Sequence, residues 1–366
     1  MINFESYGNR NGKINHETDN LLIKGNNLLA LHSLLPKYRG RVKLIYIDPP
    51  YNTGNDGFKY NDAFNHSTWL VFMKNRLEVA RQLLSDDGVI LVSINDKEHA
   101  YLKVLMDEVF GRESYKNDLI WYYLAMSSNP VGKFRNAHEK ILFYANKKFK
   151  NINQQTQIKY KFSNVENVVE KLANKLHKNY YELMSYLGYE YDENIKSWFS
   201  WYNKTTQTKD FFNTQYDDVL YVPPVNRMAI ERLNEFDNQK PERLIELLIS
   251  FFTNPGDLVL DFFAGSGTTA AVAHKMGRRW ITIEQMDYVE TITKVRLQKV
   301  LDGEQGGVSK NHKWQGGGSF VYFELFEWNK KFEEMIKNAS SIENLVLLYN
   351  QIKEQAFWRY DLDIND

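Results

Sequence analysis

The stretch that most constrains the fold is residues 44–51, which read LIYIDPPY. Its first four residues are apolar or aromatic, with two β-branched isoleucines, and this is typical of a buried strand. Proline lacks the backbone N–H that a central strand needs, so we expect the strand to end at Asp48, before Pro49 and Pro50. Ligands of open α/β sheets bind beyond the carboxyl ends of the strands. The sequence therefore predicts that a carboxylate, a rigid turn and the ring of Tyr51 lie at a ligand site.

Short apolar runs alternate with helical patterns before residue 146 and again after residue 240. We expect strands at residues 21–24, 41–47, 89–94, 119–124, 140–145, 258–263, 280–283 and 320–323. Helices are expected at residues 28–36, 67–84, 96–110, 242–252, 268–276 and 288–301, the first closed by Pro36 and the third capped by Asp96. This alternation predicts βαβ units and a parallel sheet, which is a Rossmann-like α/β fold.

The composition of the chain changes near residue 147, where Lys, Asn, Tyr and Gln become frequent and the alternation of strands and helices stops. A helical stretch is expected at residues 168–188. We therefore divide the chain into a first half of the α/β domain at 1–146, an inserted module at 147–225, a second half at 226–325 and a helical tail at 326–366.

Composition excludes several classes of protein. The chain has no cysteine, which removes disulfides, cysteine-ligated zinc and thiolate nucleophiles. Its formal net charge is +0, so no global charge indicates a nucleic-acid binder, although a local basic cleft is compatible with it. The cluster Lys37, Arg39, Arg41 and Lys43 either contacts phosphate or is a solvated loop. The eight histidines show no metal-binding spacing, so no metal is expected.

No stretch approaches the ~20 apolar residues of a membrane span. Residues 1–5 lack the basic and apolar blocks of a signal peptide. We expect no membrane partner and a cytoplasmic protein.

A second motif, DFFAGSGTTA at residues 261–270, reads as a strand, a glycine turn and a helix. Gly265 and Gly267 let the backbone approach a ligand, and Glu284 ends the next strand at the spacing of a residue that holds a ribose. These features predict a nucleotide-type cofactor site. The spacing alone fits a dinucleotide-binding unit equally well.

The first motif distinguishes a methyl-donor cofactor from a dinucleotide, because an enzyme that transfers hydride does not need an Asp-Pro-Pro-Tyr sequence. The exocyclic amine of adenine or cytosine is a poor nucleophile, since its lone pair is delocalised into the ring. Hydrogen bonds from that amine to Asp48 and to the Pro49 carbonyl would expose the lone pair, while Tyr51 offers a face for a flipped base. A methyl group can then pass directly from a sulfonium donor. The lack of cysteine excludes the covalent route of cytosine C5-methylation.

With these motifs in this order, the chain resembles amino-methylating DNA methyltransferases of the β group. Residues 22–27 (LIKGNN), 48–54 and 303–325 further resemble the modification subunit of type III restriction–modification systems. The likeness covers residues 20–150 and 235–330. It implies a class I S-adenosylmethionine-dependent methyltransferase fold with permuted motif order, in which residues 147–225 recognise the DNA target.

The resemblance also implies S-adenosylmethionine as the methyl donor and, because Asp leads the tetrad, adenine N6 as the acceptor in double-stranded DNA. The predicted catalytic residues are Asp48, Pro49, Pro50 and Tyr51. The predicted cofactor-binding residues are Asn26, Lys240, Pro241, Asp261, Phe263, Ala264, Gly265, Gly267, Thr268 and Glu284. A homodimer and a restriction subunit are the expected protein partners.

Three alternatives stay open at this point. A cytosine N4-methyltransferase has the same architecture. An RNA or protein methyltransferase can use a similar motif, although the large insert suits duplex DNA better. A non-catalytic DNA-binding subunit could keep the fold for recognition alone, but the complete sequence from Asp48 to Tyr51 favours an enzyme.

Overall fold

The computed structural model describes residues 4–8, 15, 17–54, 64–122, 138–150, 189–192, 197–200, 219–222, 224–225, 231–233, 236, 238–325, 336–339, 341–342 and 344–348. The helix expected at 168–188 lies outside them. No helix within these ranges combines the length and the apolar character that crossing a membrane requires.

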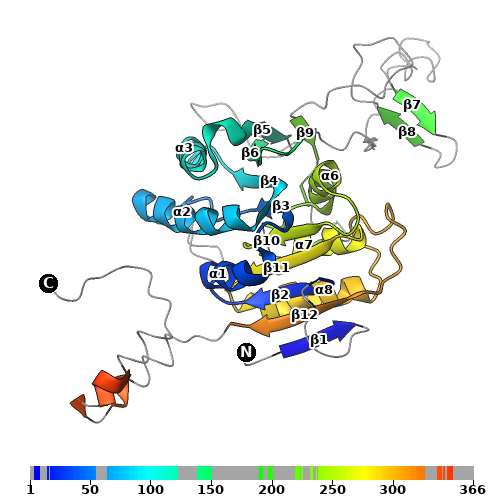
Figure 1. Ribbon diagram of the computed structural model, residues 1–366. Helices are drawn as coiled ribbons and strands as arrows, with labels where there is room; N and C mark the ends of the chain where they lie inside the picture. Colours follow the sequence, from blue (N-terminus) through cyan, green and yellow to red (C-terminus); the bar gives the residue numbers. More distant parts are fainter. Residues whose placement is uncertain are drawn as a thin grey trace.

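A ten-stranded mixed sheet forms the centre of the molecule, in the order β1-β12-β2-β11-β10-β3-β4-β6-β5-β9 (Figure 1). The strands are β1 (Phe4–Gly8), β2 (Asn20–Lys24), β3 (Val42–Ile47), β4 (Leu84–Ile94), β5 (Tyr115–Tyr122), β6 (His138–Ala145), β9 (Val219–Tyr221), β10 (Leu258–Asp261), β11 (Arg279–Glu284) and β12 (Ser319–Glu324). The central strands are buried on both faces, which explains their continuous apolar sequences.

Two hydrophobic clusters pack against the two faces of the sheet. The first cluster takes its helical residues from α1 (Asn27–Tyr38), α2 (His66–Leu83) and α3 (His99–Phe110). The second takes them from α6 (Glu242–Phe252), α7 (Thr268–Lys275) and α8 (Lys294–Leu301). Figure 1 shows these two groups of helices on opposite sides of the sheet. The molecule therefore has three layers, as the Rossmann-like interpretation predicts.

The strand order places a topological switch point between β3 and β10. These two strands are parallel neighbours, with Leu260 opposite Ile45. From β10 the chain crosses through α7 to β11 on one side, whereas from β3 it crosses through α2 to β4 on the other. Because the two crossovers diverge, a crevice opens at the carboxyl ends of β3 and β10. The two predicted motifs begin at these two strand ends.

The structure corrects several details predicted from sequence. The sheet is mixed, not parallel, because β6 runs antiparallel to both β4 and β5, and β1 runs antiparallel to β12. Pro36 lies inside α1, which continues to Tyr38. Asp96 pairs with Lys140, at 2.9 Å, and the N-cap of α3 is Glu98. Residues 289–293, expected to be α-helical, form a π-helical turn before α8.

The described part of the predicted insert contains three strands. β7 (Tyr189–Asp192) and β8 (Ser197–Ser200) form a separate antiparallel pair. β9 pairs with β5 at the edge of the main sheet, so this sheet takes one strand from within residues 147–225.

Candidate active site

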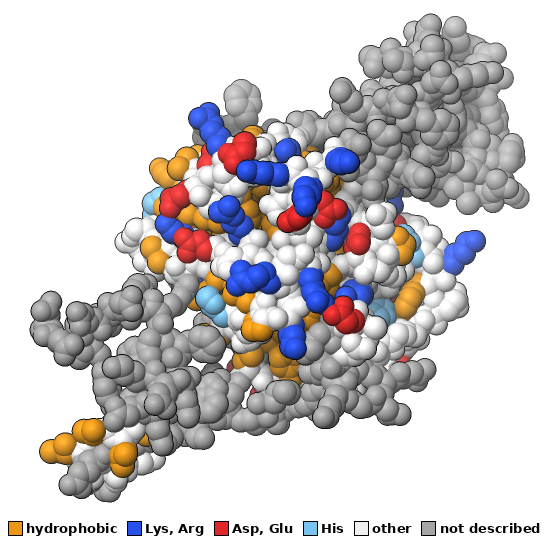
Figure 2. All heavy atoms as spheres, in the orientation of Figure 1, with side chains coloured by type: hydrophobic (Ala, Val, Ile, Leu, Met, Phe, Trp, Pro, Cys, Tyr) orange, Lys and Arg blue, Asp and Glu red, His pale blue; other side chains and the backbone are white. Residues whose placement is uncertain are grey.

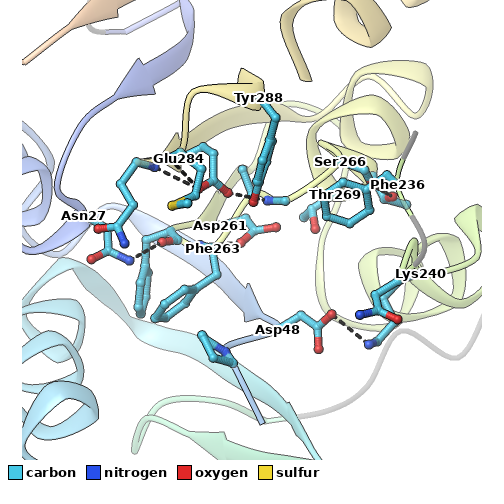
Figure 3. A pocket seen from close by; sticks show the side chains of 18 of the residues that line it. Asn27, Asp48, Phe236, Lys240, Asp261, Phe263, Ser266, Thr269, Glu284 and Tyr288 are labelled. Atoms are coloured by element: carbon cyan, nitrogen blue, oxygen red, sulfur yellow. Dashed lines mark hydrogen bonds and ion pairs between the residues drawn. The ribbon is translucent and has the colours of Figure 1, made fainter. Parts of the chain in front are cut away.

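A cavity of about 110 Å³, open to solvent, lies at the switch point between β3 and β10. Asp48 lines it from the end of β3, Asp261 from the end of β10 and Glu284 from the end of β11. Lys240 lines it from the segment that enters α6. Figure 3 shows Asp48 and Lys240 facing each other, with Asp261 and then Glu284 farther from Lys240. The cavity thus combines three carboxylates with one ammonium group.

The glycine turn after β10 is held by a backbone hydrogen bond to Glu284, whose own orientation is fixed by two further backbone donors. One carboxylate oxygen of Glu284 accepts from the Gly265 N–H at 2.8 Å, and the other accepts from Gln285 and Met286 at 2.9 and 3.1 Å. Burial raises the pKa of Glu284. Gly265 has a φ of 50°, in the left-handed region that favours glycine. Glu284 therefore fixes the turn that shapes this wall of the cavity.

Asp261 is the most deeply buried of the three carboxyl groups, with 3% of its surface exposed. It accepts a hydrogen bond from the Phe263 N–H at 3.0 Å. Burial raises the pKa of Asp261 to about 7, and the charges of Asp48 and Glu284 act in the same direction. A carboxyl group in this position is therefore partly protonated near neutral pH.

Asp48 forms an ion pair with Lys240, in which Nζ lies 2.7 Å from Oδ2. Burial raises the pKa of Asp48, against the opposing effect of Lys240 and with a further rise from Glu139. Burial disfavours the charged form of Lys240 and acts to lower its pKa. The neighbouring carboxylates of Asp48 and Glu139 have a larger opposite effect, so the pKa of Lys240 lies above its usual range. Lys240 thus stays protonated and holds the carboxylate of Asp48 in place at the cavity wall.

The hydroxyl of Tyr51 lies 2.7 Å from Asp48 Oδ1 and 2.8 Å from Glu139 Oε2. Burial, followed by the charges of Asp48 and Glu139, raises the pKa of Tyr51 well above its ordinary value. Lys240 Nζ lies 5.1 Å from the centre of the Tyr51 ring. Tyr51 is therefore neutral, and its ring is oriented by the contacts at its hydroxyl.

Two further side chains form hydrogen bonds to the backbones of the two motifs. Asn27 donates to the Phe262 carbonyl at 2.7 Å and accepts from Arg76 at 2.6 Å, which joins the end of β10 to α1 and α2. The Trp69 indole donates to the Pro50 carbonyl at 2.9 Å. Both motifs are thus anchored to the helices of one face, so their geometry is set before a ligand arrives.

A buried ionic network lies behind the glycine turn. Glu242 is 1% exposed and contacts Arg296 at 2.8 Å and Lys275 at 2.9 Å. Burial alone would raise the pKa of Glu242, but these two cations overcome it and hold the pKa low. Arg296 also donates to the Thr268 hydroxyl at 2.8 Å. The network therefore joins α6, α7 and α8 beneath the end of the turn, where α7 begins.

Comparison with known proteins identifies the family of this chain. The family model described as DNA methylase matches residues 42–294, a range that contains both motifs and both strand ends of the switch point. The chain belongs to the DNA methylase family. This assignment confirms the family resemblance seen in the sequence. The strand order β2-β11-β10-β3-β4-β6-β5 agrees with the Rossmann-like fold expected of class I methyltransferases.

The curated relatives of this DNA methylase include Mod subunits of type III restriction-modification enzymes. A probable type III restriction-modification enzyme HindVI Mod subunit of Haemophilus influenzae is 36% identical, over 95% of this chain and 59% of the relative. The EcoP15I Mod subunit of Escherichia coli is 28% identical, over 72% of this chain and 57% of the relative. The chain therefore spans somewhat more than half the length of these relatives. A solved putative DNA modification methylase of Thermus thermophilus is 17% identical, with a TM-score of 0.49, over 84% of this chain and all of the other.

Most of the site residues predicted for this DNA methylase meet in the cavity. Those that line it are Asp48, Pro50, Lys240, Asp261, Phe263, Ala264, Gly265, Thr268 and Glu284. Pro49, Tyr51, Pro241 and Gly267 do not line it, although each adjoins a residue that does. Asn26 caps α1 by accepting from the Leu28 N–H at 3.0 Å, and its neighbour Asn27 faces the cavity instead.

Sequence reasoning missed several lining residues, among them Asn27, Phe236, Asn238, Met286 and Tyr288. Phe236 and Asn238 lie shortly before Lys240 in the sequence. The prediction that Lys240 lines the site was therefore the signal that could have identified them. Met286 and Tyr288 follow Glu284 at the end of β11. Their side chains are brought to the cavity by the turn after the strand, and no spacing rule specifies this.

Two of the four basic residues in the cluster at residues 37–43 pair with neighbouring carboxylates. Arg41 pairs with Glu17, and Lys43 pairs with Asp87 at 2.6 Å. Figure 2 shows Lys and Arg side chains interspersed with Asp and Glu on the face in view. These pairs favour the interpretation of this cluster as a solvated surface. Within the described ranges, no group of three or more His, Asp or Glu side chains is arranged to hold a metal ion.

Substitution of Gly307 should destabilise the protein, because this glycine packs against the buried ionic network around Glu242. A Cβ at Gly307 would lie 2.0 Å from Glu242 Oε2, and Gly307 has a φ of 55°. We expect Gly307→Ala to lower the free energy of unfolding by about 3–5 kcal/mol, because it separates a buried ion pair. Gly40→Ala is the matched control, since Gly40 has a φ of 69° and open space around it. That control should lose only about 1 kcal/mol. Equal losses in urea unfolding would contradict the prediction.

Proposed function

We propose that this chain is a site-specific DNA methyltransferase that transfers a methyl group from S-adenosylmethionine to N6 of adenine in duplex DNA. The observation that carries the proposal is that Asp48, after β3, and the Asp261–Thr268 turn, after β10, line one cavity. A cofactor turn and an amine-binding motif have to meet in this way for direct transfer between two ligands. The names of the similar Mod subunits support a role as the modification component of a restriction–modification system.

The residues of the cavity fit S-adenosylmethionine. This cofactor is a nucleoside that carries a positive sulfonium and an ammonium group, so its site needs an apolar wall and negative charge. Phe263 and Phe236 provide the apolar wall, while Asp261 and Glu284 provide carboxyl groups. A Cβ at Gly265 would lie 3.3 Å from the Phe236 ring, so the absence of a side chain keeps space open at the turn. When bound, the cofactor supplies a methyl group on a positively charged sulfur.

The chain's own residues prepare the acceptor. Asp48 and the Pro49 carbonyl accept hydrogen bonds from the exocyclic amine, which draws its lone pair out of conjugation with the ring. Tyr51 stacks on the flipped base. Glu284, at the end of β11, accepts hydrogen bonds from the ribose hydroxyls of the cofactor. Methyl transfer is direct, because the chain has no cysteine to form a covalent adduct with the base.

The proposed partners follow from the same function. Double-stranded DNA is the substrate, and residues 147–225 form the target-recognition module between the catalytic and cofactor-binding halves. The enzyme acts in the cytoplasm as a homodimer and pairs with a restriction subunit. Support for the last point comes from the relatives, which are named as Mod subunits of type III restriction-modification enzymes.

The function is tested by expressing the chain in a bacterial host that lacks adenine and cytosine methyltransferases. We expect N6-methyladenine in nucleosides digested from the host DNA and methylation at one sequence motif across the genome. N4-methylcytosine in place of N6-methyladenine would contradict the proposed acceptor. An unmodified genome in cells that contain folded protein would contradict the enzymatic role and favour a non-catalytic DNA-binding subunit.

The raised pKa of Asp261 predicts a pH dependence of stability. The folded protein keeps the carboxyl proton until about pH 7, whereas the unfolded chain releases it near the ordinary value of about 4. Between these pH values the folded state binds more protons. The contribution of Asp261 to stability is therefore fully present below about pH 4 and is lost as the pH rises through about 7. We expect Asp261→Asn to remove a pH dependence worth on the order of 4 kcal/mol between about pH 4 and 7, measured by urea unfolding without cofactor. Parallel pH profiles for the two proteins would contradict this.

A further inference from the structure

Tyr51 lies between two carboxyl groups at hydrogen-bond distance from both. Its hydroxyl is 2.7 Å from Asp48 Oδ1 and 2.8 Å from Glu139 Oε2. The hydroxyl has a single hydrogen, so it can donate fully to only one of the two groups. The other contact becomes a hydrogen bond when that carboxyl carries a proton and donates to the tyrosine oxygen. The three side chains therefore form a continuous path along which one proton can move.

Lys240 makes this path able to take up a proton. Its Nζ lies 2.7 Å from Asp48 Oδ2 and 3.4 Å from Glu139 Oε2. Two carboxylates and one ammonium give the cluster a net charge of −1. Addition of one proton makes the cluster neutral and leaves Lys240 in place. Two carboxylates that share one cation favour the binding of a single proton between them.

The two ends of the path face different surroundings. Asp48 lines the cavity, next to the position proposed for the target amine. Glu139 stands on β6, opposite Trp121 of β5, and 19% of its side chain is exposed to solvent. The ring between them belongs to Tyr51, whose neutral hydroxyl both donates and accepts. The side chain of Asp48 is itself 22% exposed, so both ends reach water in the absence of a ligand, and Glu139 is the exit when a flipped base covers Asp48.

We infer that Asp48, Tyr51 and Glu139 form a proton relay that removes the proton released by the methylated amine. The inference rests on the proposed function. Methyl transfer forms an N–C bond as the S–C bond breaks, and the positive charge that develops on the amine nitrogen is relieved by loss of a proton in the same transition state. That nitrogen gives one proton to Asp48. Asp48 passes it to the oxygen of Tyr51 as Tyr51 gives its own hydrogen to Glu139. Glu139 then releases a proton to water, so the cluster returns to its starting state.

The test uses the full chain with Tyr51→Phe, Glu139→Gln and the double variant. Tyr51→Phe keeps the ring that stacks on the base, and Glu139→Gln keeps the shape of the side chain. Glu78→Gln is the matched control, because it removes a half-exposed carboxylate on α2. The single-turnover rate of methyl transfer is measured over a range of pH, with enzyme preloaded with S-adenosylmethionine and mixed with plasmid DNA. Dissociation constants for cofactor and DNA are measured alongside.

We expect each single variant to transfer methyl about 10²-fold more slowly, with both dissociation constants within about twofold of the wild-type values. The double variant should be no slower than the slower single variant, because both changes interrupt one route. The acid limb of the pH profile should move to lower pH in Glu139→Gln, since Glu139 raises the pKa of Asp48. Tyr46, Asp261 and Glu284 also face this cluster or its neighbours, and they are unchanged in every variant.

Three results would overturn the relay: a wild-type rate in Glu139→Gln, losses that multiply in the double variant, or an unmoved acid limb. If the wild-type chain transfers methyl and Glu139→Gln does so equally fast, the relay alone fails. If the wild-type chain transfers no methyl to any DNA, the proposed function fails and the relay with it.

Discussion

Asp48→Ala is expected to lower the single-turnover rate of methyl transfer by about 10²–10³-fold. The change removes the carboxylate that accepts a hydrogen bond from the target amine, and with it the group that Lys240 and Tyr51 contact. Cofactor binding should change little, because the glycine turn is held by Glu284 and Asn27 rather than by Asp48. The rate is measured with labelled S-adenosylmethionine, and cofactor affinity by calorimetry.

Asp96→Ala provides the control for Asp48→Ala. Asp96 follows β4, the neighbour of β3, and pairs with Lys140 outside the cavity. Loss of this acid should leave the rate within about twofold of wild type, as expected for an exposed ion pair. A rate in Asp48→Ala close to that of Asp96→Ala would contradict the role of Asp48.

Gly267→Ala is expected to weaken S-adenosylmethionine binding by about tenfold or more. A Cβ at this position would lie 2.9 Å from Thr293 Cγ2, so Thr293 would have to move. Thr293 donates to the Gly265 carbonyl at 2.7 Å, which means that its displacement disturbs the turn lining the cavity. A loss of ~1.4 kcal/mol in binding free energy corresponds to tenfold. Calorimetric titration with the cofactor measures the effect directly.

Gly277→Ala is the control that distinguishes the steric clash with Thr293 from backbone strain alone. Gly277 has a φ of 70°, close to the 78° of Gly267, but a Cβ at Gly277 would have no atom within 4 Å outside its chain neighbours. Both substitutions therefore carry a similar left-handed strain, on the order of 1 kcal/mol. Only Gly267→Ala should lose cofactor affinity. Equal affinities in the two variants would show that the turn at Gly267 does not shape the cofactor site.

The sequence predicted the two motifs and the order of the α/β elements because each is a local signal. Residues 44–51 contain both the apolar run of β3 and the prolines that end it. Residues 261–268 likewise contain a strand, a turn and the start of a helix. The conclusion that the two motifs meet depends on one rule, that ligands gather at the carboxyl ends of neighbouring parallel strands. The switch point between β3 and β10 satisfies that rule.

Long-range contacts could not be predicted from the sequence, because no motif spacing encodes them. The position of β6 between β4 and β5 brings Glu139 to Tyr51, and an apolar strand sequence does not specify its direction. Lys240 was assigned to the cofactor pocket, but its ammonium also pairs with Asp48 from a distant part of the chain. The prediction for Pro36 failed because proline in the last turn of a helix removes only one hydrogen bond, and α1 continues for two residues.

The proposed function requires that the cavity between β3 and β10 bring S-adenosylmethionine and a flipped adenine together. Its most direct test is incubation of the purified chain with methyl-labelled S-adenosylmethionine and unmethylated duplex DNA, followed by mass spectrometry of the digested nucleosides. We predict label in N6-methyladenine with the wild-type chain and its loss with Asp48→Ala. Label in N4-methylcytosine, or equal label in N6-methyladenine with both proteins, would contradict the proposal.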